Sequence, residues 1–153
     1  MNRFISISTR LLLMVLAMVT VFAVKSNAGS VDERFKAVIN TEIQKVTQTQ
    51  DPVLKRKMLG DFLTRMDQGI GMAKASVSEK DAPALNALQT KMRADYAELD
   101  GNGVTKVPDS ELNHFAGYVQ QDVEQADYYS GGGVYLSVGA IIVILLLILI
   151  LFR

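Results

Sequence analysis

A run of 19 residues, from Val134 to Phe152, carries no charged side chain and consists mainly of Ile, Leu and Val. As an α-helix it would be about 28 Å long, close to the roughly 30 Å thickness of the hydrocarbon core of a bilayer. A buried core helix is the alternative, but a helix that is apolar on every face needs a larger protein around it than this chain offers. We therefore expect 134–152 to form a transmembrane helix through which the chain contacts the membrane.

The flanks of this run predict its orientation. Tyr128, Tyr129 and Tyr135 cluster at its start, and such aromatic rings favour the membrane–water interface. Arg153 follows its end, and a basic residue is favoured on the cytoplasmic side. We expect the C-terminus to lie in the cytoplasm with no domain beyond it. Function would then reside in the outer domain, in the membrane helix or in a processing event between them.

The first 28 residues have the three parts of a secretory signal. Arg3 and Arg10 supply the positive start, Leu11 to Val24 is an uncharged apolar run, and Ser26-Asn27-Ala28 offers small residues for cleavage. The apolar run is shorter than the roughly 20 residues of a membrane span, so we expect cleavage after Ala28 rather than an uncleaved anchor. The chain is thus predicted to be a single-pass protein of the cell membrane. Its domain, residues 29–130, would lie on the extracytoplasmic (periplasmic) side, with residues 131–133 as a flexible glycine linker.

Apolar residues recur every three or four positions in four parts of the outer domain, which predicts four amphipathic helices. The expected ranges are 31–49, 52–74, 82–99 and 109–129. No such helix is stable alone, so we expect an all-α fold in which about four helices form a small antiparallel bundle, with packing like that of a short coiled coil. The residues expected to face the core are Val31, Phe35, Val38, Ile39, Ile43, Val46, Leu54, Met58, Leu59, Phe62, Leu63, Met66, Ile70, Leu85, Leu88, Met92, Tyr96, Leu99, Leu112, Phe115, Val119, Val123 and Ala126.

Polar residues before these helices predict where they begin. Ser30 and Glu33 have the spacing of a capping box at the first helix. Asp51, Asp81 and Asp109 precede the next three helices, and aspartate is a favoured N-cap residue.

The composition excludes several function classes. All 16 acidic residues follow Ala28, together with 13 of the 16 basic residues, and this acidic balance argues against a nucleic-acid-binding protein. There is no cysteine, which excludes disulfides, thiolate catalysis and cysteine-based zinc sites. His114 is the only histidine, and we expect it to be a partly buried structural residue. No carboxylates are grouped by their spacing, so we expect no catalytic residue, no enzyme activity and no bound cofactor.

The segment from Glu98 to Asp109 resembles the calcium loop of an EF-hand. Aligned by Gly103, its candidate ligands are Glu98, Asp100, Asn102 and Asp109, because such loops supply oxygen atoms at alternate positions. Lys106 stands at a further ligand position, and only one such loop is present. The alternative is a plain turn, since Asp-Gly-Asn-Gly favours the positive φ angles that break a helix. The resemblance implies at most a weak calcium site, and no other metal ligands are expected.

Two charged segments leave alternatives open. Residues 107–133 contain five acidic residues and no Lys or Arg, which indicates a solvated helix face or a surface for a basic partner. The basic segment Lys55-Arg56-Lys57 is either the intramolecular complement of that face or a surface patch. The acidic residues are Asp109, Glu111, Asp122, Glu124 and Asp127.

Small residues at the start of the apolar run suggest one further contact. Gly133 and Ser137 are four positions apart and Gly139-Ala140 follow, a spacing that lets membrane helices approach closely. Self-association through these residues is therefore an alternative to binding an unknown protein partner.

The order of Ser130-Gly131-Gly132-Gly133, the apolar run and Arg153 resembles the glycine-rich C-terminal sorting signals of some bacterial surface proteins. This resemblance implies that a protease cuts near the glycines and that the anchor is temporary.

Together these features predict a membrane-anchored extracytoplasmic helical protein that acts as a binding or scaffold protein through protein–protein contacts. A substrate of C-terminal sorting, released or re-anchored at the cell surface, is the first alternative. A weak calcium-responsive module is the second.

Overall fold

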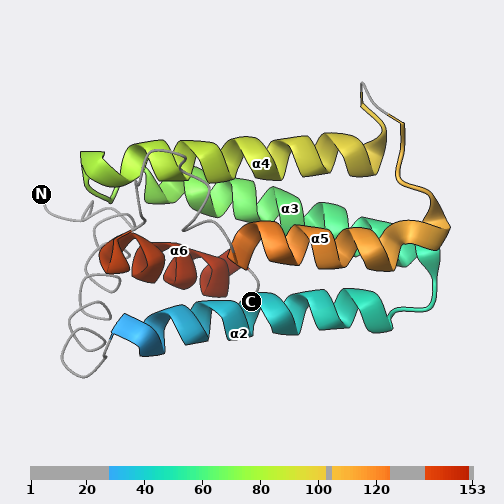
Figure 1. Ribbon diagram of the computed structural model, residues 1–153, viewed down its shortest axis with the longest axis horizontal. Coiled ribbons are helices and arrows are strands. Elements are labelled where there is room, and N and C mark those ends of the chain that lie inside the picture. The colour runs from blue at the N-terminus through green and yellow to red at the C-terminus, as the bar shows by residue number, and fades with distance from the viewer. Residues whose placement is uncertain (1–27, 103–104, 125–136, 152–153) are drawn as a thin grey trace, which may run out of the picture.

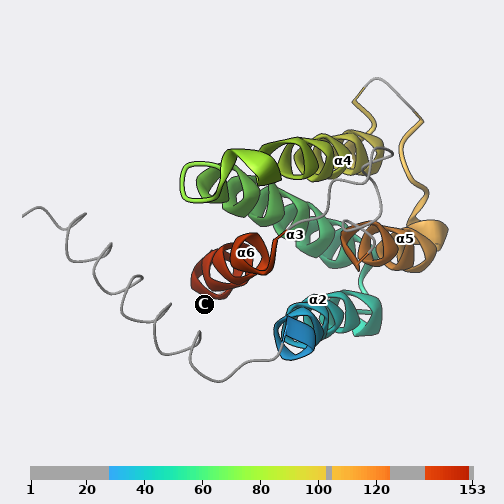
Figure 2. The same ribbon diagram turned by 60° about the vertical axis from the view of Figure 1, so that its left-hand side comes forward.

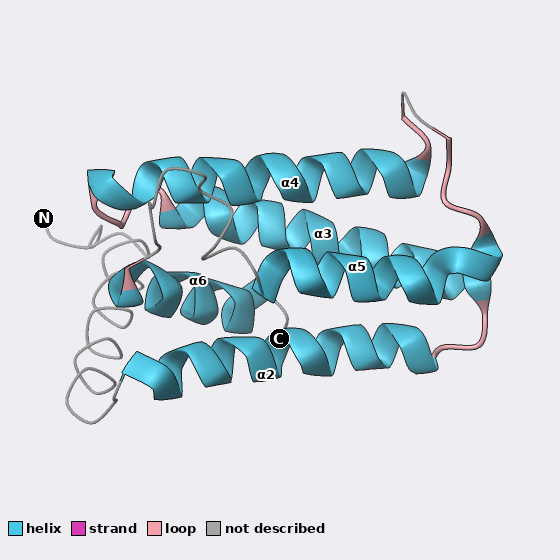
Figure 3. Cartoon of the chain, in the orientation of Figure 1, coloured by secondary structure: helices cyan, strands magenta, loops and turns pink. Residues whose placement is uncertain are grey.

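The computed structural model describes residues 28–102, 105–124 and 137–151, and within these ranges every regular element is helical (Figures 1 and 3). The expected all-α fold is confirmed. The helices are α2 (Ala28–Gln48), α3 (Pro52–Ala73), α4 (Ala82–Asp100), α5 (Leu112–Glu124) and α6 (Val138–Leu151), with 3-10 turns η1 (Glu79–Asp81) and η2 (Asp109–Glu111) before α4 and α5.

Helices α2, α3, α4 and α5 run alternately in opposite directions, as expected for an antiparallel bundle (Figure 1). The most extensive pairing is between α3 and α4, and α5 packs mainly against α2. Helix α6 lies against α3 and α2, toward the end of the bundle at which α2 begins (Figures 1 and 2). The fifth helix is therefore packed into the bundle made by the other four.

One predicted helix cap is confirmed. The Asp51 carboxylate accepts hydrogen bonds from the backbone N–H groups of Val53 at 2.8 Å and Leu54 at 3.3 Å, which would otherwise have no partner in the first turn of α3. Pro52 occupies the first helical position, where its missing N–H costs nothing. These two residues set the start of α3.

Three other predicted caps are wrong. Ser30 lies inside α2, which already includes Ala28, so it is not the N-cap. Asp81 makes no side-chain bond to the start of α4, because η1 continues directly into that helix and the carboxylate binds other groups. Asp109 is the first residue of η2 and its carboxylate pairs with Arg56 instead. In both aspartates a tertiary partner outcompetes the local cap.

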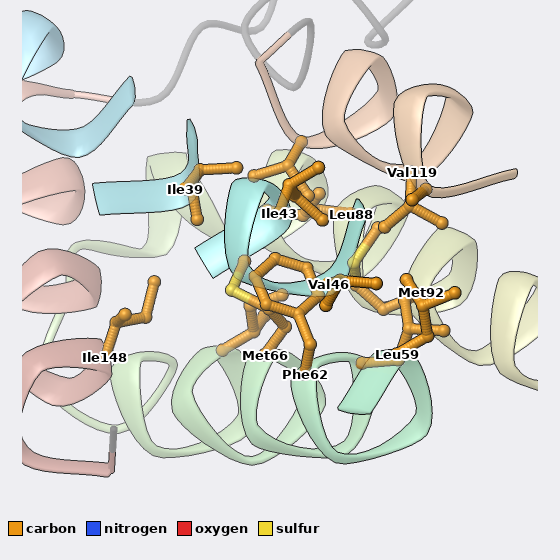
Figure 4. Packing of buried hydrophobic residues seen from close by; sticks show 14 of the residues in the cluster. Ile39, Ile43, Val46, Leu59, Phe62, Met66, Leu88, Met92, Val119 and Ile148 are labelled. Atoms are coloured by element: carbon orange, nitrogen blue, oxygen red, sulfur yellow. The ribbon is translucent and has the colours of Figure 1, made fainter. Parts of the chain in front are cut away.

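One hydrophobic cluster joins the five helices. Figure 4 shows side chains of α2, α3, α4 and α5 gathered together, with Ile148 of α6 beside them. Most of the predicted core residues are buried or partly buried, but Leu54 and Tyr96 are exposed. The side chains of Val31 and Ala126 lie outside those described. The confirmed members are Phe35, Val38, Ile39, Ile43, Val46, Met58, Leu59, Phe62, Leu63, Met66, Ile70, Leu85, Leu88, Met92, Leu99, Leu112, Phe115, Val119 and Val123.

Helix α6 is part of this cluster, which differs from the expectation that the bundle excludes the apolar run. Ile144 and Ile148 are fully buried between α2 and α3, with Ala140 and Ile141 nearly so. Among the described residues, no helix combines the length and the hydropathy needed to cross a membrane.

Several sequence predictions fall on residues outside the described ranges. These are the signal segment up to residue 27, the glycine linker at 131–133, the tyrosines at 128, 129 and 135, and both ends of the expected membrane span.

Candidate functional site

The calcium-like loop is held by an arginine rather than arranged around a metal position. Asp109 accepts a hydrogen bond from Arg56 at 2.6 Å, and the Asn102 amide donates to Asp100 at 2.9 Å. Glu98 is exposed, and its backbone carbonyl accepts the N–H of Val107 at 3.3 Å. In the described part of the chain, no group of three or more acidic or histidine side chains could hold a metal. The structure thus brings Asp100 and Asn102 together but engages Asp109 elsewhere.

Arg56 joins three parts of this loop. Its guanidinium also donates to the backbone carbonyls of Leu99 and Val107, both at 2.6 Å, so it ties the end of α4 to the start of η2. The neighbouring Lys55 donates to Asn113 at 2.7 Å. Of the two alternatives for the basic segment, the structure therefore supports the intramolecular one. The planar fork of arginine suits this task, because it directs several N–H groups at once.

His114 is exposed on α5, so the prediction that it is partly buried is wrong. It follows Asn113 and precedes the buried Phe115, and the helical turn carries it just off the core face. A shift of one position along a helix turns a side chain by about 100° around the axis, which is enough to move it from the core face to the solvent.

The start of α6 is fixed by a buried carboxylate. Asp81 accepts hydrogen bonds from the backbone N–H of Ser137 at 2.7 Å and from its hydroxyl at 2.9 Å. The Ser78 hydroxyl donates to the same carboxylate at 2.9 Å. Ser137 in turn caps α6, since its Oγ accepts the N–H of Ala140 at 3.2 Å. We call Asp81, Ser78 and Ser137 the Asp81 latch.

The Asp81 carboxylate is almost fully buried, which disfavours its charged form. The hydrogen bonds from the Ser137 backbone and the two serine hydroxyls favour that form more strongly. The pKa of Asp81 is therefore held below its usual value. The latch is a charged, fully bonded contact at neutral pH.

The outward side of α6 is apolar and open to solvent. Leu149 is 49% exposed and Ile150 is 53% exposed, and α6 has no polar side chain between Val138 and Leu151. Between α6 and α2 the surface forms a groove of about 300 Å³. Its lining is apolar apart from Arg34 and consists of Arg34, Ala37, Val38, Ile142, Leu145, Leu146 and Leu149.

A second polar cluster, with two buried carboxylates, lies between α4 and α5. The Lys91 ammonium donates to the Tyr118 hydroxyl at 2.6 Å and lies 4.6 Å from the centre of its ring. It also pairs with Asp122 at 3.1 Å and with Asp95 at 3.6 Å. The side chains of both aspartates are only 2% exposed, and within the described residues Asp95 Oδ2 has no hydrogen-bond partner. We call these four residues the charge cluster.

The charge cluster holds two carboxylates against one ammonium group. Burial, opposed by Lys91 and reinforced by the like charge of Asp122, raises the pKa of Asp95 to about 6. Burial alone would lower the pKa of Lys91. Its contacts with Tyr118, Asp122 and Asp95 outweigh that effect, so the pKa of Lys91 is raised. The arrangement can take up one proton near neutral pH, and it contains no nucleophile activated by a base.

Sequence reasoning missed the charge cluster. The sequence predicts Asp122 on an acidic face that is either solvated or open to a basic partner, but this residue is buried against Lys91. Lys91 and Asp95 are four positions apart on a helix face that otherwise continues the apolar stripe, and that interruption is the one available signal. Ser137, considered for contacts between membrane helices, is instead bonded within the chain.

No family model, no curated protein and no solved structure matches this chain.

Proposed function

We propose that the chain is a membrane-anchored helical protein, with 134–152 as its anchor, and that its bundle serves as an extracytoplasmic binding or scaffold domain. The observation that carries the proposal is the composition of α6. Of its 14 residues, all but Gly139 and Ala140 are Leu, Ile or Val, whereas α2 to α5 each combine an apolar stripe with polar residues.

The bundle buries only one side of this apolar helix. Ile144 and Ile148 are buried, but Leu149 and Ile150 remain about half exposed. Exposed apolar surface of this kind marks a contact with another molecule or with lipid. A bilayer would cover every side, and each Leu, Ile or Val near its centre favours insertion by roughly 0.3 to 0.6 kcal/mol. Membrane attachment thus accounts for a helix that a bundle alone would not require.

The part of the bundle at the start of α3 supports a role in binding proteins. Val53, Leu54 and Tyr96 are exposed large side chains on helices whose core-facing apolar residues are buried. Val53 and Tyr96 border a cleft of about 300 Å³ that Gly60, without a side chain, leaves open. Arg56, Lys57, Asp61 and Asp100 also line this cleft, so it combines apolar and charged groups. Protein interfaces have this mixed character.

Membrane attachment is tested by fractionating cells that express the full chain and washing the membranes with alkaline carbonate. We expect the protein to stay in the washed pellet, and a variant that ends at residue 133 to be released. Because the sequence has no cysteine, a single one at exposed Thr105 can then report orientation. A membrane-impermeant maleimide should label it in intact cells. Release of the full chain by carbonate would contradict the anchor.

Intact-mass measurement of the membrane-derived protein separates a lasting anchor from a temporary one. A chain that begins at residue 29 and ends at Arg153 supports the scaffold. A chain that ends near residues 131–133 supports the alternative of C-terminal sorting.

A further inference from the structure

Helix α6 fits its place on the bundle closely. Its residues Ile141, Ile144 and Ile148 enter the core, and Gly69 of α3 lies beneath it. A Cβ atom at Gly69 would stand 3.6 Å from Leu151 and 3.9 Å from Leu147. These are ordinary van der Waals distances, so Gly69 directly faces α6 and a small side chain would fit there. We call this surface between α2 and α3, which includes Gly69 and receives Ile141, Ile144 and Ile148 of α6, the seat.

The seat also makes hydrogen bonds that are specific to the start of the bound helix. In the Asp81 latch, the N-cap residue of α6, Ser137, donates to the Asp81 carboxylate through both its N–H and its hydroxyl. A carboxylate beside a helix N-terminus is favoured by the helix dipole as well as by these bonds. The latch fixes the register of α6, and the apolar contacts bury its inner side.

The seat nevertheless covers only the inner side of α6, and the outer side is apolar and exposed. A bilayer could cover both sides, but a helix cannot occupy the seat and a bilayer at once. We propose that the seat between α2 and α3 is a helix-binding site that α6 occupies reversibly, docked on the bundle outside a bilayer and released from the Asp81 latch on insertion. This inference rests on the proposed membrane anchor.

A disulfide between α6 and the seat tests the exchange. The Cβ atom built at Gly69 lies 3.9 Å from that of Leu147, which is within the range for disulfides, and the natural chain has no cysteine. The full-length double variant G69C/L147C is purified, oxidised in air and mixed with phosphatidylcholine vesicles. The two single variants and the same double variant after reduction serve as controls.

We expect the disulfide to form, the oxidised protein to lose vesicle binding in flotation, and the reduced protein to float with the vesicles. Reduced protein that floats while no disulfide forms would overturn the exchange and leave the anchor standing. So would an oxidised protein that floats as well as the reduced one. A disulfide that forms while neither state binds vesicles would overturn the anchor and the exchange together.

A second variant probes the latch without a disulfide. Asp81→Asn keeps the shape of the side chain but loses the charge that accepts three hydrogen bonds. The ratio of vesicle-bound to free protein should rise about fivefold to tenfold, because bonds to a charged group are the stronger kind. Ser76→Ala, in the loop before η1, is the matched control and should leave the ratio unchanged. An unchanged ratio in Asp81→Asn would remove the latch from the exchange.

Discussion

Asp95 of α4 and Asp122 of α5 share the single ammonium group of Lys91, at 3.6 Å and 3.1 Å, where solvent hardly reaches either carboxylate. Lys91 and Glu98 on α4 and Asp122 on α5 act on the charge of Asp95. The side of α4 that faces α3 has its own ion pair, Arg93 with Asp67 at 2.7 Å. Ionised Asp95 is thus a buried charge beside a second carboxylate, and keeping it charged has a cost at neutral pH.

Asp95→Asn should consequently stabilise the protein at pH 7. The folded-state pKa of Asp95 is about 6, above its ordinary value of 3.8, so its ionisation weakens the fold as the pH rises through 6. The penalty should fade as the pH falls toward 4. We expect a gain of about 1–3 kcal/mol in the free energy of unfolding at pH 7, and a smaller gain at pH 5.

Urea unfolding of both proteins between pH 5 and pH 8 measures this difference. The matched control is Asp61→Asn, because Asp61 pairs with Lys57 on the exposed surface. Its effect should stay within roughly 0.5 kcal/mol at every pH. A gain for Asp95→Asn that is the same at pH 5 and pH 8 would show that Asp95 does not titrate in this window.

The Asp81 latch should have the opposite pH dependence. The pKa of Asp81 lies below its ordinary value, so its contribution is present above about pH 4 and is lost as the pH falls through the folded-state pKa. Asp81→Asn should lower the free energy of unfolding at pH 7 by about 1–3 kcal/mol. A double-mutant cycle with Ser137→Ala should give a coupling of at least about 0.5 kcal/mol. Purely additive effects would mean that the two residues act independently.

The sequence predicts the local elements better than the contacts between them. The stripes that contain Ile39, Leu63, Met92 and Val119 identify four helices, because burial repeats with the helical period. The cap at Asp51 is equally local, since its partners are two and three positions away. Most of the burial within each helix follows from these patterns, whereas which helices pack against each other does not.

The site residues depend on contacts that span the chain. Asp81 and Ser137 are 56 positions apart, and Arg56 and Asp109 are 53 apart. Local rules assigned both aspartates to helix caps, where a carboxylate is also favourable. The place of α6 could not be read from its sequence, because a helix without a polar face carries no record of which side is buried.

Arg56 should be worth more to stability than its neighbours in the basic segment. Arg56→Met removes three hydrogen bonds and leaves the carbonyls of Leu99 and Val107 without this donor. We expect a loss of about 2–4 kcal/mol in the free energy of unfolding. Lys57→Met, which breaks an exposed pair with Asp61, should cost no more than about 0.5 kcal/mol. Similar losses in urea unfolding would contradict the role of Arg56.

Calcium should not bind the loop at 98–109 while Arg56 holds it. A metal would have to displace the guanidinium from Asp109, and Lys106 adds a positive charge nearby. We expect no heat on titrating the full chain with millimolar calcium, compared with magnesium as the control. A saturable heat with calcium alone would revive the calcium-responsive alternative.

Gly101 and Gly117 should respond in opposite directions to the same substitution. Gly101 ends α4 with a φ of 80°, and a Cβ there would lie 2.9 Å from the Cβ of Lys106. Gly101→Ala should therefore destabilise the protein by about 1–2 kcal/mol through left-handed backbone strain and this clash. Gly117 lies inside α5 and a Cβ there would meet nothing within 4 Å, so Gly117→Ala should stabilise by about 0.5–1 kcal/mol. Thermal unfolding of the two variants beside the natural chain measures both effects. A stabilising Gly101→Ala would mean that α4 does not end in the left-handed conformation, and that the loop clamped by Arg56 leaves the helix by another route.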